Sequence, residues 1–276
     1  MIFLYTRGKE RSRRPEAILE EVKALAENGY VEVTLLGQNV NAYGKDFKDI
    51  NYTFADLLKD LNKIDIKRIR YTTSHPRDLD DATIDAMALG GNIMPHLHLP
   101  VQSGNNRVLK KMNRKYTREE YLEKIKKLKE KVPGISITTD IIVAFPGETE
   151  EEFEDTLTLV DEVGYEGAYT FIYSPREGTP AATYENLLTE EQKHARLNRL
   201  NERINEGFLK GRLRFEGEVV EVLVDGPSKN NPNMTTGYTP HNMLVNFEAK
   251  DAQIGDLVKV KIIKAYSWHL LGELVK

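Results

Sequence analysis

The sequence has 276 residues, of which 30% are charged and 40% hydrophobic, with a formal net charge of -4. These values are typical of a water-soluble globular protein, and no apolar run approaches the ~20 residues of a membrane span. Without a secretory signal or any cysteine, a disulfide framework is excluded and a cytoplasmic location is the default expectation. A slightly acidic chain has no overall attraction to nucleic acid, so RNA contact would need a local patch.

Up to about residue 210, helix-like and strand-like patterns alternate. The first helix begins at Pro15, repeats apolar residues at helical spacing, and ends at Asn28-Gly29. Further helices are expected at residues 53–61, 80–89, 117–131, 148–163 and 189–210, and strands at residues 31–36, 68–73, 96–101, 136–144 and 168–173. Repeated βα units predict a parallel sheet with right-handed crossovers. Because the pattern begins with a helix, we expect a strand to be missing upstream, which leaves the sheet open.

Polar or Gly/Pro-rich segments follow the expected strands. They are Gly37-Gln38-Asn39, residues 73–77 (TSHPR), Gln102-Ser103-Gly104, residues 145–149 (FPGET) and residues 174–180 (SPREGTP). In parallel sheets and barrels, ligands bind at the loops that follow the strands. The sequence therefore predicts a functional site at this edge of the sheet.

Each segment also has a purely structural interpretation. The amides of Gln38 and Asn39 offer donors and acceptors to a ligand, or stabilise their own turn. His96 and His98 alternate in one expected strand and so share a face, either as metal ligands or as buried, hydrogen-bonded histidines. Residues 146–150 (PGETE) present backbone N–H groups to a ligand, or only cap the next helix.

After about Arg212 the pattern changes to the alternation of β-strands. Strands are expected at residues 219–224, 243–247, 257–263 and 268–275, with a long loop at residues 225–240. This predicts a small antiparallel, OB-like barrel. Long loops often form binding surfaces. Tyr238, His241 and Trp268 could stack on nucleic-acid bases. Trp268 could equally belong to the hydrophobic core.

These motifs, in this order, resemble the methylthiotransferases of the radical S-adenosylmethionine (SAM) superfamily, most closely the branch that modifies tRNA. The segments that carry the resemblance are YTRGKERSR (5–13), LLGQNVNAYG (35–44), TSHPRD (73–78), HLPVQSGNN (98–106), MNRKYTREEY (112–121), TDIIVAFPGETEEEF (139–153) and YSPREGTPAA (173–182). The tail, with VEVLVDGPSK (220–229), resembles the TRAM domain, a small RNA-binding barrel.

The resemblance implies a partial, open TIM-like (β/α) radical SAM barrel at residues 1–211 that lacks its first strand, and a TRAM domain at residues 212–276. It implies methylthiolation at carbon-2 of isopentenylated adenosine beside the tRNA anticodon. The partners it implies are SAM, two 4Fe-4S clusters, the tRNA anticodon stem-loop and a reductant of the flavodoxin or ferredoxin type.

Site residues follow from the same resemblance. The residues expected to contact SAM are Gln38, Asn39, Gln102, Ser103, Ile142, Val143, Phe145 and Pro146. Those expected to contact the substrate base or RNA are Arg7, Lys9, Arg13, Arg176, Glu177, Lys229, Tyr238, His241 and Trp268. A basic N-terminal stretch could also be no more than a solvated terminus.

The sequence departs from the family pattern in three respects. It has no cysteine to ligate a cluster, and Met1 falls about where the third cysteine of the family's CxxxCxxC loop is expected. Nothing matches the family's N-terminal domain. Ala144 and Leu4 stand where the family usually has Gly and Pro. We therefore expect a fragment that is inactive alone, in which no catalytic residue can be assigned.

Three alternatives remain open on this evidence. The chain could be a non-catalytic tRNA-binding remnant, or a methylthiotransferase acting on ribosomal protein S12. It could also be an unrelated (β/α) enzyme that needs no cluster, although no convincing acid–base pair follows the strands.

Overall fold

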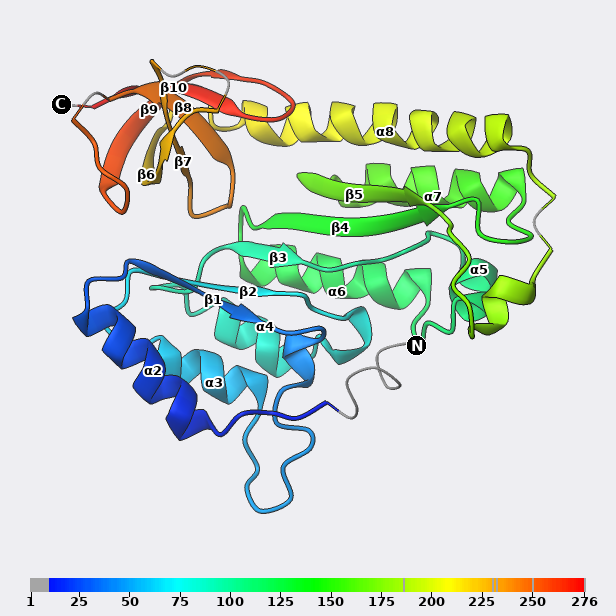
Figure 1. Cartoon of the computed structure of the whole chain (residues 1–276), viewed down its shortest axis with the longest axis horizontal. Helices are drawn as coiled ribbons and strands as arrows, with labels where there is room; N and C mark the ends of the chain where they lie inside the picture. The colour runs from blue at the N-terminus through cyan, green and yellow to red at the C-terminus, as the bar shows by residue number, and fades with distance from the viewer. Residues whose placement is uncertain (1–9, 186, 230, 232, 250, 276) are drawn as a thin grey trace.

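The computed structural model describes residues 10–275 apart from 186, 230, 232 and 250. A layered α/β part occupies most of the chain, and a small β-barrel follows it (Figure 1). The long helix α8 (Glu190–Leu213) runs along the α/β part and leads directly into the barrel. The domain boundary that the sequence predicted between residues 211 and 212 lies in the last turn of α8.

The α/β part contains five parallel strands in sequence order. Their bounds are β1 (Glu32–Leu36), β2 (Arg68–Thr72), β3 (His96–His98), β4 (Ser136–Val143) and β5 (Gly167–Ile172). β1 pairs with β2, and β3, β4 and β5 form a second set. The two sets are linked where Ile69 bonds to the segment just before β3, with its amide 2.7 Å from Asn92 O. Among the described residues, β1 and β5 are therefore open edges.

The described residues contain seven helices, five of which lie between successive strands of the sheet, while the first precedes β1 and α8 follows β5. Besides α8 they are α2 (Pro15–Glu27), α3 (Phe54–Leu61), α4 (Asp81–Met87), α5 (Asn106–Lys111), α6 (Arg118–Lys131) and α7 (Glu150–Val163). Short 3-10 turns follow at Val40–Ala42, Pro76–Asp78 and Pro180–Thr183. Capping boxes begin α3, α6, α7 and α8 at Thr53, Thr117, Thr149 and Thr189, which satisfies their first free amides. The sequence did not predict α5, which has only one and a half turns.

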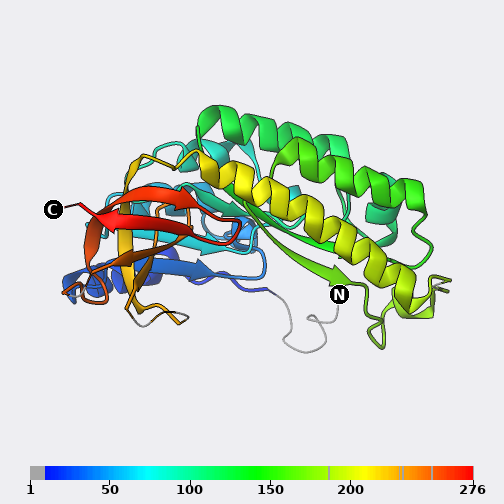
Figure 2. The same cartoon turned by 90° about the horizontal axis from the view of Figure 1, so that it is seen from above.

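Along each strand, successive side chains point to opposite faces of the sheet. Ile69, Tyr71, Leu97, Ile141 and Val143 are almost fully buried in one core with the apolar sides of the helices. The residues between them point to the opposite face, which the helices do not cover (Figure 2). We call this second side the inner face. It carries Arg68, Arg70, His96, His98, Thr138, Asp140, Ile142, Tyr169 and Phe171.

β3 is shorter than the sequence predicted, ending at His98 instead of residue 101. Pro100 has no N–H to donate to a neighbouring strand, so the regular ladder stops before it. The chain stays extended, and the amide of Gln102 bonds to Asp140 O at 2.8 Å. The other expected strands of the α/β part lie within a residue or two of their observed bounds.

The tail forms a closed barrel in the order β10-β8-β7-β6-β9. The strands are β6 (Val219–Pro227), β7 (Thr235–Tyr238), β8 (Leu244–Glu248), β9 (Leu257–Ala265) and β10 (Leu270–Leu274). The expectation of an antiparallel barrel was wrong in one pairing, because β10 runs parallel to β8. A ring with an odd number of strands cannot alternate in direction all the way round. β7 was also missed, since it lies inside the expected loop at residues 225–240.

The barrel docks on the inner face at the amino ends of the strands. Arg68 Nη1 donates to Tyr238 O at 2.8 Å, and Arg70 donates to Thr239 O at 2.8 Å and to Pro240 O at 3.0 Å. Both arginines are at least nine-tenths buried. Glu32 completes the contact through an ion pair with Arg70 at 2.8 Å. The barrel therefore covers the end of the sheet opposite to the predicted site.

Among the described residues, no helix has the length and apolar character needed to cross a bilayer.

Candidate active site at the carboxyl ends of the strands

Backbone hydrogen bonds join the segments that follow neighbouring strands. Val40 N donates to Thr73 O at 2.9 Å, and Ser74 N donates to His98 O at 3.2 Å. Gln102 and Ile141 then form a parallel bridge. The segments that the sequence predicted to meet after β1, β2 and β3 are therefore brought together at one edge, with the last of them bonded to β4.

Asn39 is held beside a buried carboxylate. Its Nδ2 donates to Asp78 Oδ2 at 2.6 Å, and Lys45 and Arg77 also bond to Asp78. Burial alone would raise the pKa of Asp78, but the hydrogen bonds from Arg77, Lys45 and Asn39 hold it well below its usual range. Asn39 Oδ1 is buried without a hydrogen-bond partner in the described part of the chain. The side chain of Asn39 therefore keeps one acceptor that no described residue uses.

A cavity of about 700 Å³ lies along the open edge of β1, between this strand, α2 and residues 10–13. Gln38 and Asn39 line it at the strand end, together with Arg11, Arg13 and Arg77. Arg13 also forms an exposed ion pair with Glu21 at 2.7 Å. The cavity thus combines amides and cationic groups at one end with apolar side chains of α2 along its length.

The loop after β3 packs tightly against α7. Thr156 Oγ1 accepts from the amide of Gly104 at 2.9 Å, and Ser103 Oγ lies 3.5 Å from the same oxygen. A Cβ on Gly104 would lie 2.5 Å from Asp155 O, so only glycine fits here. Ser103 is fully buried and Gln102, at φ 71, is nearly so. The side chain of Ser103 is therefore engaged in holding the loop.

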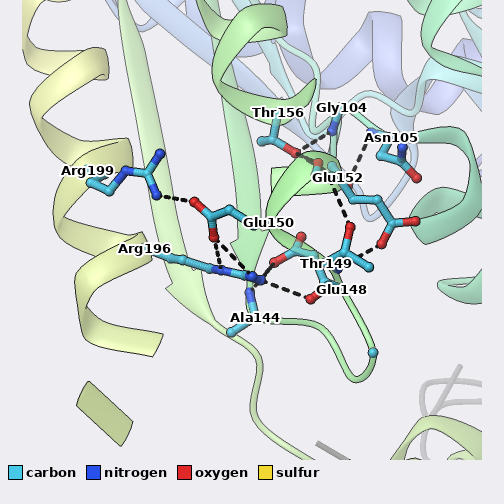
Figure 3. A network of polar contacts seen from close by, with 12 residues as sticks. Gly104, Asn105, Ala144, Glu148, Thr149, Glu150, Glu152, Thr156, Arg196 and Arg199 are labelled. Carbon is cyan, nitrogen blue, oxygen red and sulfur yellow. Dashed lines mark hydrogen bonds and ion pairs between the residues drawn. The ribbon is translucent and has the colours of Figure 1, made fainter. Parts of the chain in front are cut away.

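The 144–149 turn is anchored to α8 by a buried ion pair (Figure 3). Glu148 Oε2 accepts from the amide of Ala144 at 2.8 Å and from Arg196 Nη1 at 2.9 Å. Burial raises the pKa of Glu148 to about 7, against the lowering effects of the Ala144 amide and Arg196. Ala144 adopts φ 57, in the left-handed region where the family's glycine would be unstrained.

Of the four residues predicted here as SAM contacts, Ile142 alone has a half-buried side chain on the inner face. Val143 points into the helix-side core, Phe145 packs against Tyr173 with ring centroids 5.0 Å apart, and Pro146 is buried. Thr149 caps α7, as the structural interpretation of the 146–150 segment predicted. Beyond β5, Arg176 and Glu177 are exposed. Arg7 and Lys9 lie outside the described residues.

Three histidines near the sheet are held by hydrogen bonds. His75 Nδ1 accepts from the amide of Arg77 at 3.1 Å, and burial followed by Arg114 lowers the pKa of His75 to about 4. His96 and His98 share a face, as expected, and both contact Thr138 Oγ1, at 3.3 and 3.0 Å. No group of three or more possible metal ligands occurs in the described residues. The two strand histidines are thus hydrogen-bonded, half-buried residues.

The predicted RNA contacts of the tail separate into two groups. Lys229, Tyr238 and Trp268 are exposed, so the core alternative for Trp268 is excluded, and its ring meets Phe208 edge to face at 5.4 Å. His241 instead packs against Phe215 at 5.2 Å, and burial lowers its pKa to about 4. His241 therefore packs within the tail, against a ring of the tail's own core.

The residues present differ in how well they fit the expected cofactors. A 4Fe-4S cluster needs thiolates, and the sequence has no cysteine, so this chain cannot ligate one. A SAM molecule needs hydrogen-bonding groups for its amino-acid end and ribose. The unpartnered Asn39 Oδ1 at a strand end fits that requirement.

Comparison with known proteins identifies the class. Residues 3–160 match the Radical SAM superfamily and residues 213–275 match the TRAM domain. The E. coli coproporphyrinogen III oxidase (HemN), a radical SAM enzyme, superposes with a TM-score of 0.54 at 15% identity, covering 82% of this chain and 59% of that one. The chain belongs to the radical SAM superfamily, with a TRAM domain at its carboxyl end.

Within this superfamily the chain is similar to tRNA-2-methylthio-N(6)-dimethylallyladenosine synthases. The enzymes of Bacillus cytotoxicus and Anoxybacillus flavithermus are each 60% identical to it over 272 residues, which is 99% of this chain. Those residues are 53% and 52% of the two relatives, so the chain spans about half their length. The methylthiotransferase resemblance and the α/β-plus-barrel fold predicted from the sequence are confirmed.

Several residues that hold the molecule together around the sheet were missed from the sequence. In β2, Arg68 and Arg70 alternate with Ile69 and Tyr71. This alternation of charged and apolar residues could have predicted that the two arginines share the inner face. The role of Arg196 could not be predicted in this way, because its partner Glu148 lies in another segment and only folding brings the two side chains together.

Proposed function

We propose that this chain is the SAM-binding and RNA-binding portion of a methylthiotransferase acting on carbon-2 of isopentenylated adenosine beside the tRNA anticodon. The observation that carries the proposal is the 60% identity, over nearly the whole chain, to synthases named for that product. The TRAM match supports RNA as the substrate class. We divide the chain at residues 211/212 into the SAM-binding part and the RNA-binding domain.

In this proposal, the strand ends hold SAM. The amides of Gln38 and Asn39 would orient its amino-acid end, Gln102 and Ser103 its ribose region, and Ile142 to Pro146 its adenine. Since Ser103, Val143 and Phe145 have buried side chains, their contribution would come from the backbone. SAM, when bound and reduced by a cluster, supplies a 5′-deoxyadenosyl radical. The chain's own residues position the molecule and exclude water.

The electron path would come from other parts of the enzyme. Two 4Fe-4S clusters and a flavodoxin- or ferredoxin-type reductant are needed by the family reaction, and this cysteine-free chain supplies no cluster ligand. We therefore infer that the chain alone is inactive. Arg176 and Glu177, exposed beyond β5, would approach the target base, and Arg7, Lys9, Arg13 and Lys229 would contact phosphates.

The proposal is tested by joining this chain to the portion of a relative's sequence that this chain does not cover. The preceding half of the Bacillus cytotoxicus synthase is fused to this chain and expressed in a strain that lacks the methylthiolation. Mass spectrometry of digested tRNA should then show methylthiolated isopentenyladenosine, and none with this chain alone. An active fusion that leaves tRNA unchanged but adds the mass of a methylthio group to ribosomal protein S12 would refute the proposal in favour of the protein substrate.

A non-catalytic tRNA-binding role is the second candidate, and the lack of any cysteine favours it. It predicts that the same fusion modifies neither substrate while the chain still binds tRNA.

A further inference from the structure

An aromatic strip lies exposed on the inner face of β5. Tyr169 and Phe171 alternate along this edge strand, and their side chains are 66% and 51% exposed. They are register partners of Asp140 and Ile142 in β4. Tyr238 of the tail barrel is also exposed, and its carbonyl oxygen accepts from Arg68 of the same inner face at 2.8 Å. Large aromatic side chains exposed in a row on an edge strand suit contact with a partner.

A carboxylate and an imidazole border this strip. His98 Nε2 lies 3.4 Å from Asp140 Oδ1, and its Nδ1 is 3.0 Å from Thr138 Oγ1. The Tyr169 ring meets His98 edge to face, with centroids 6.2 Å apart. Asp140 keeps 28% of its side chain exposed. A flat ligand on Tyr169 or Phe171 would thus have an acceptor oxygen at its rim.

This combination selects a nucleobase over other occupants. Unpaired bases stack on aromatic side chains regardless of sequence, and their amino groups donate to carboxylates. A phosphate would be repelled by Asp140, so the backbone of an RNA would lie outside the strip. Because the tail barrel docks through Arg68 and Arg70 of the inner face, the strip lies on the same side of the sheet as the proposed RNA-binding domain.

We propose that Tyr169 and Phe171 form a stacking platform for an unpaired nucleobase of an RNA, and that Asp140 accepts a hydrogen bond from its exocyclic amino group. This inference rests on the proposed RNA-binding function and adds a site to it. It predicts that oligoadenylate binds more tightly than oligouridylate, because uracil has no exocyclic amino group.

The test uses the whole chain and short single-stranded RNAs carrying the fluorescent base 2-aminopurine. Stacking should quench the fluorescence on binding. The double variant Tyr169→Ala/Phe171→Ala should lose the quenching and bind oligoadenylate about tenfold or more weakly. The conservative variant Phe171→Tyr should retain both. Tyr30→Ala is the matched control, because Tyr30 is 60% exposed but lies before β1, away from the strip.

A second variant tests the hydrogen bond. Asp140→Asn, which keeps the size of the side chain, should reduce the preference for oligoadenylate over oligouridylate while the quenching by the aromatic rings remains. An unchanged preference would refute the role of Asp140.

The outcomes distinguish this inference from the proposed function. If the chain binds RNA and the double variant binds and quenches like Tyr30→Ala, the platform is refuted and the RNA-binding function stands. If the chain binds neither oligonucleotides nor tRNA, both fail. If sedimentation shows a dimer that Phe171→Asp dissociates, the strip is an interface between copies, and the proposal is wrong.

Discussion

Glu148 and Arg196 form an ion pair inside the protein, 2.9 Å apart, with side chains that are 1% and 7% exposed. Arg196 also donates to the main-chain oxygen of Glu148 at 3.1 Å. One contact therefore ties the turn after β4 to α8, the helix that carries the tail barrel. Glu148 Oε1 is buried without a hydrogen-bond partner among the described residues, so the carboxylate depends on Arg196 and the Ala144 amide.

Replacing Arg196 should therefore destabilise the protein strongly. Arg196→Ala leaves a buried carboxylate unpaired, a change that costs about 3–5 kcal/mol in buried pairs. Arg199→Ala is the control, because Arg199 stacks on the same Phe153 ring but pairs with Glu150 and Glu154 at the surface, where such pairs contribute at most about 1 kcal/mol. Urea unfolding at pH 8 measures both. If both variants lost the same free energy of unfolding, the buried ion pair would not be the main source of stability at this place.

The raised pKa of Glu148 predicts a pH dependence of stability. Between about pH 4.5 and 7 the folded protein keeps a proton on Glu148 that the unfolded chain has released. The free energy of unfolding contributed by this group therefore falls as the pH rises through that window. Glu148→Gln cannot titrate, so its stability should gain on the wild type from pH 5 to pH 8. Parallel melting-temperature profiles for the two proteins would show that Glu148 is ionised throughout.

Arg70 should fasten the tail barrel to the sheet. Arg70→Met removes two bonds to the carbonyls of Thr239 and Pro240 and leaves Glu32 without its partner, a loss of at least about 1.5 kcal/mol. Hydrogen exchange of the backbone amides of residues 239 and 241–243 should accelerate. Lys67→Met, which removes an exposed charge just before β2, should leave exchange unchanged. Unaltered protection in Arg70→Met would place the barrel's anchorage elsewhere.

The chain should bind no iron–sulfur cluster. Anaerobic incubation with iron and sulfide, followed by desalting, should leave it colourless, because the sequence has no thiolate ligand. The intact Bacillus cytotoxicus synthase, treated in parallel, controls for the incubation. Stoichiometric bound iron and sulfide with a visible absorption band would overturn this prediction and require a ligand set of another kind.

Binding of tRNA by the chain should be weak and sensitive to salt. The net charge is -4, so only a few local phosphate contacts are expected and the affinity should be micromolar at best, on the order of nonspecific binding. Trp268→Ala should weaken it about fivefold or more, since Trp268 is 64% exposed on the tail. Electrophoretic mobility shifts at two salt concentrations measure both effects. Affinity that is independent of salt would exclude the phosphate contacts.

The alternation of elements could be predicted because each one is encoded locally. Capping threonines, apolar repeats and the Gly/Pro-rich segments at strand ends all act over a few residues. The sequence did not predict β7, because this strand is short (Thr235-Thr236-Gly237-Tyr238) and lies among turn-forming residues. Gly237 is required there, since a Cβ would lie 2.3 Å from Leu223 O, yet in sequence it reads as a turn.

The site could be predicted as a set of segments but not as a set of contacts. Gln38 and Asn39 were placed at the strand end correctly, whereas the partnership of Asn39 with Asp78 joins residues 39 positions apart. His241 looked like a free aromatic side chain in a loop. Its contact with Phe215 of the tail's core joins residues far apart in the sequence, which no local pattern encodes.

The open edges of the sheet also determine how a large substrate could enter. In the described residues β1 and β5 have neighbours on one side only, so the inner face can be approached from beside the strands as well as from their ends. A nucleotide in the middle of a long polymer has no free end to thread through a closed ring. For the RNA substrate that we propose, an entrance beside β5 would admit such a nucleotide while the polymer on both sides of it stays outside, and folded RNA would not need to be unravelled beyond the loop that carries it.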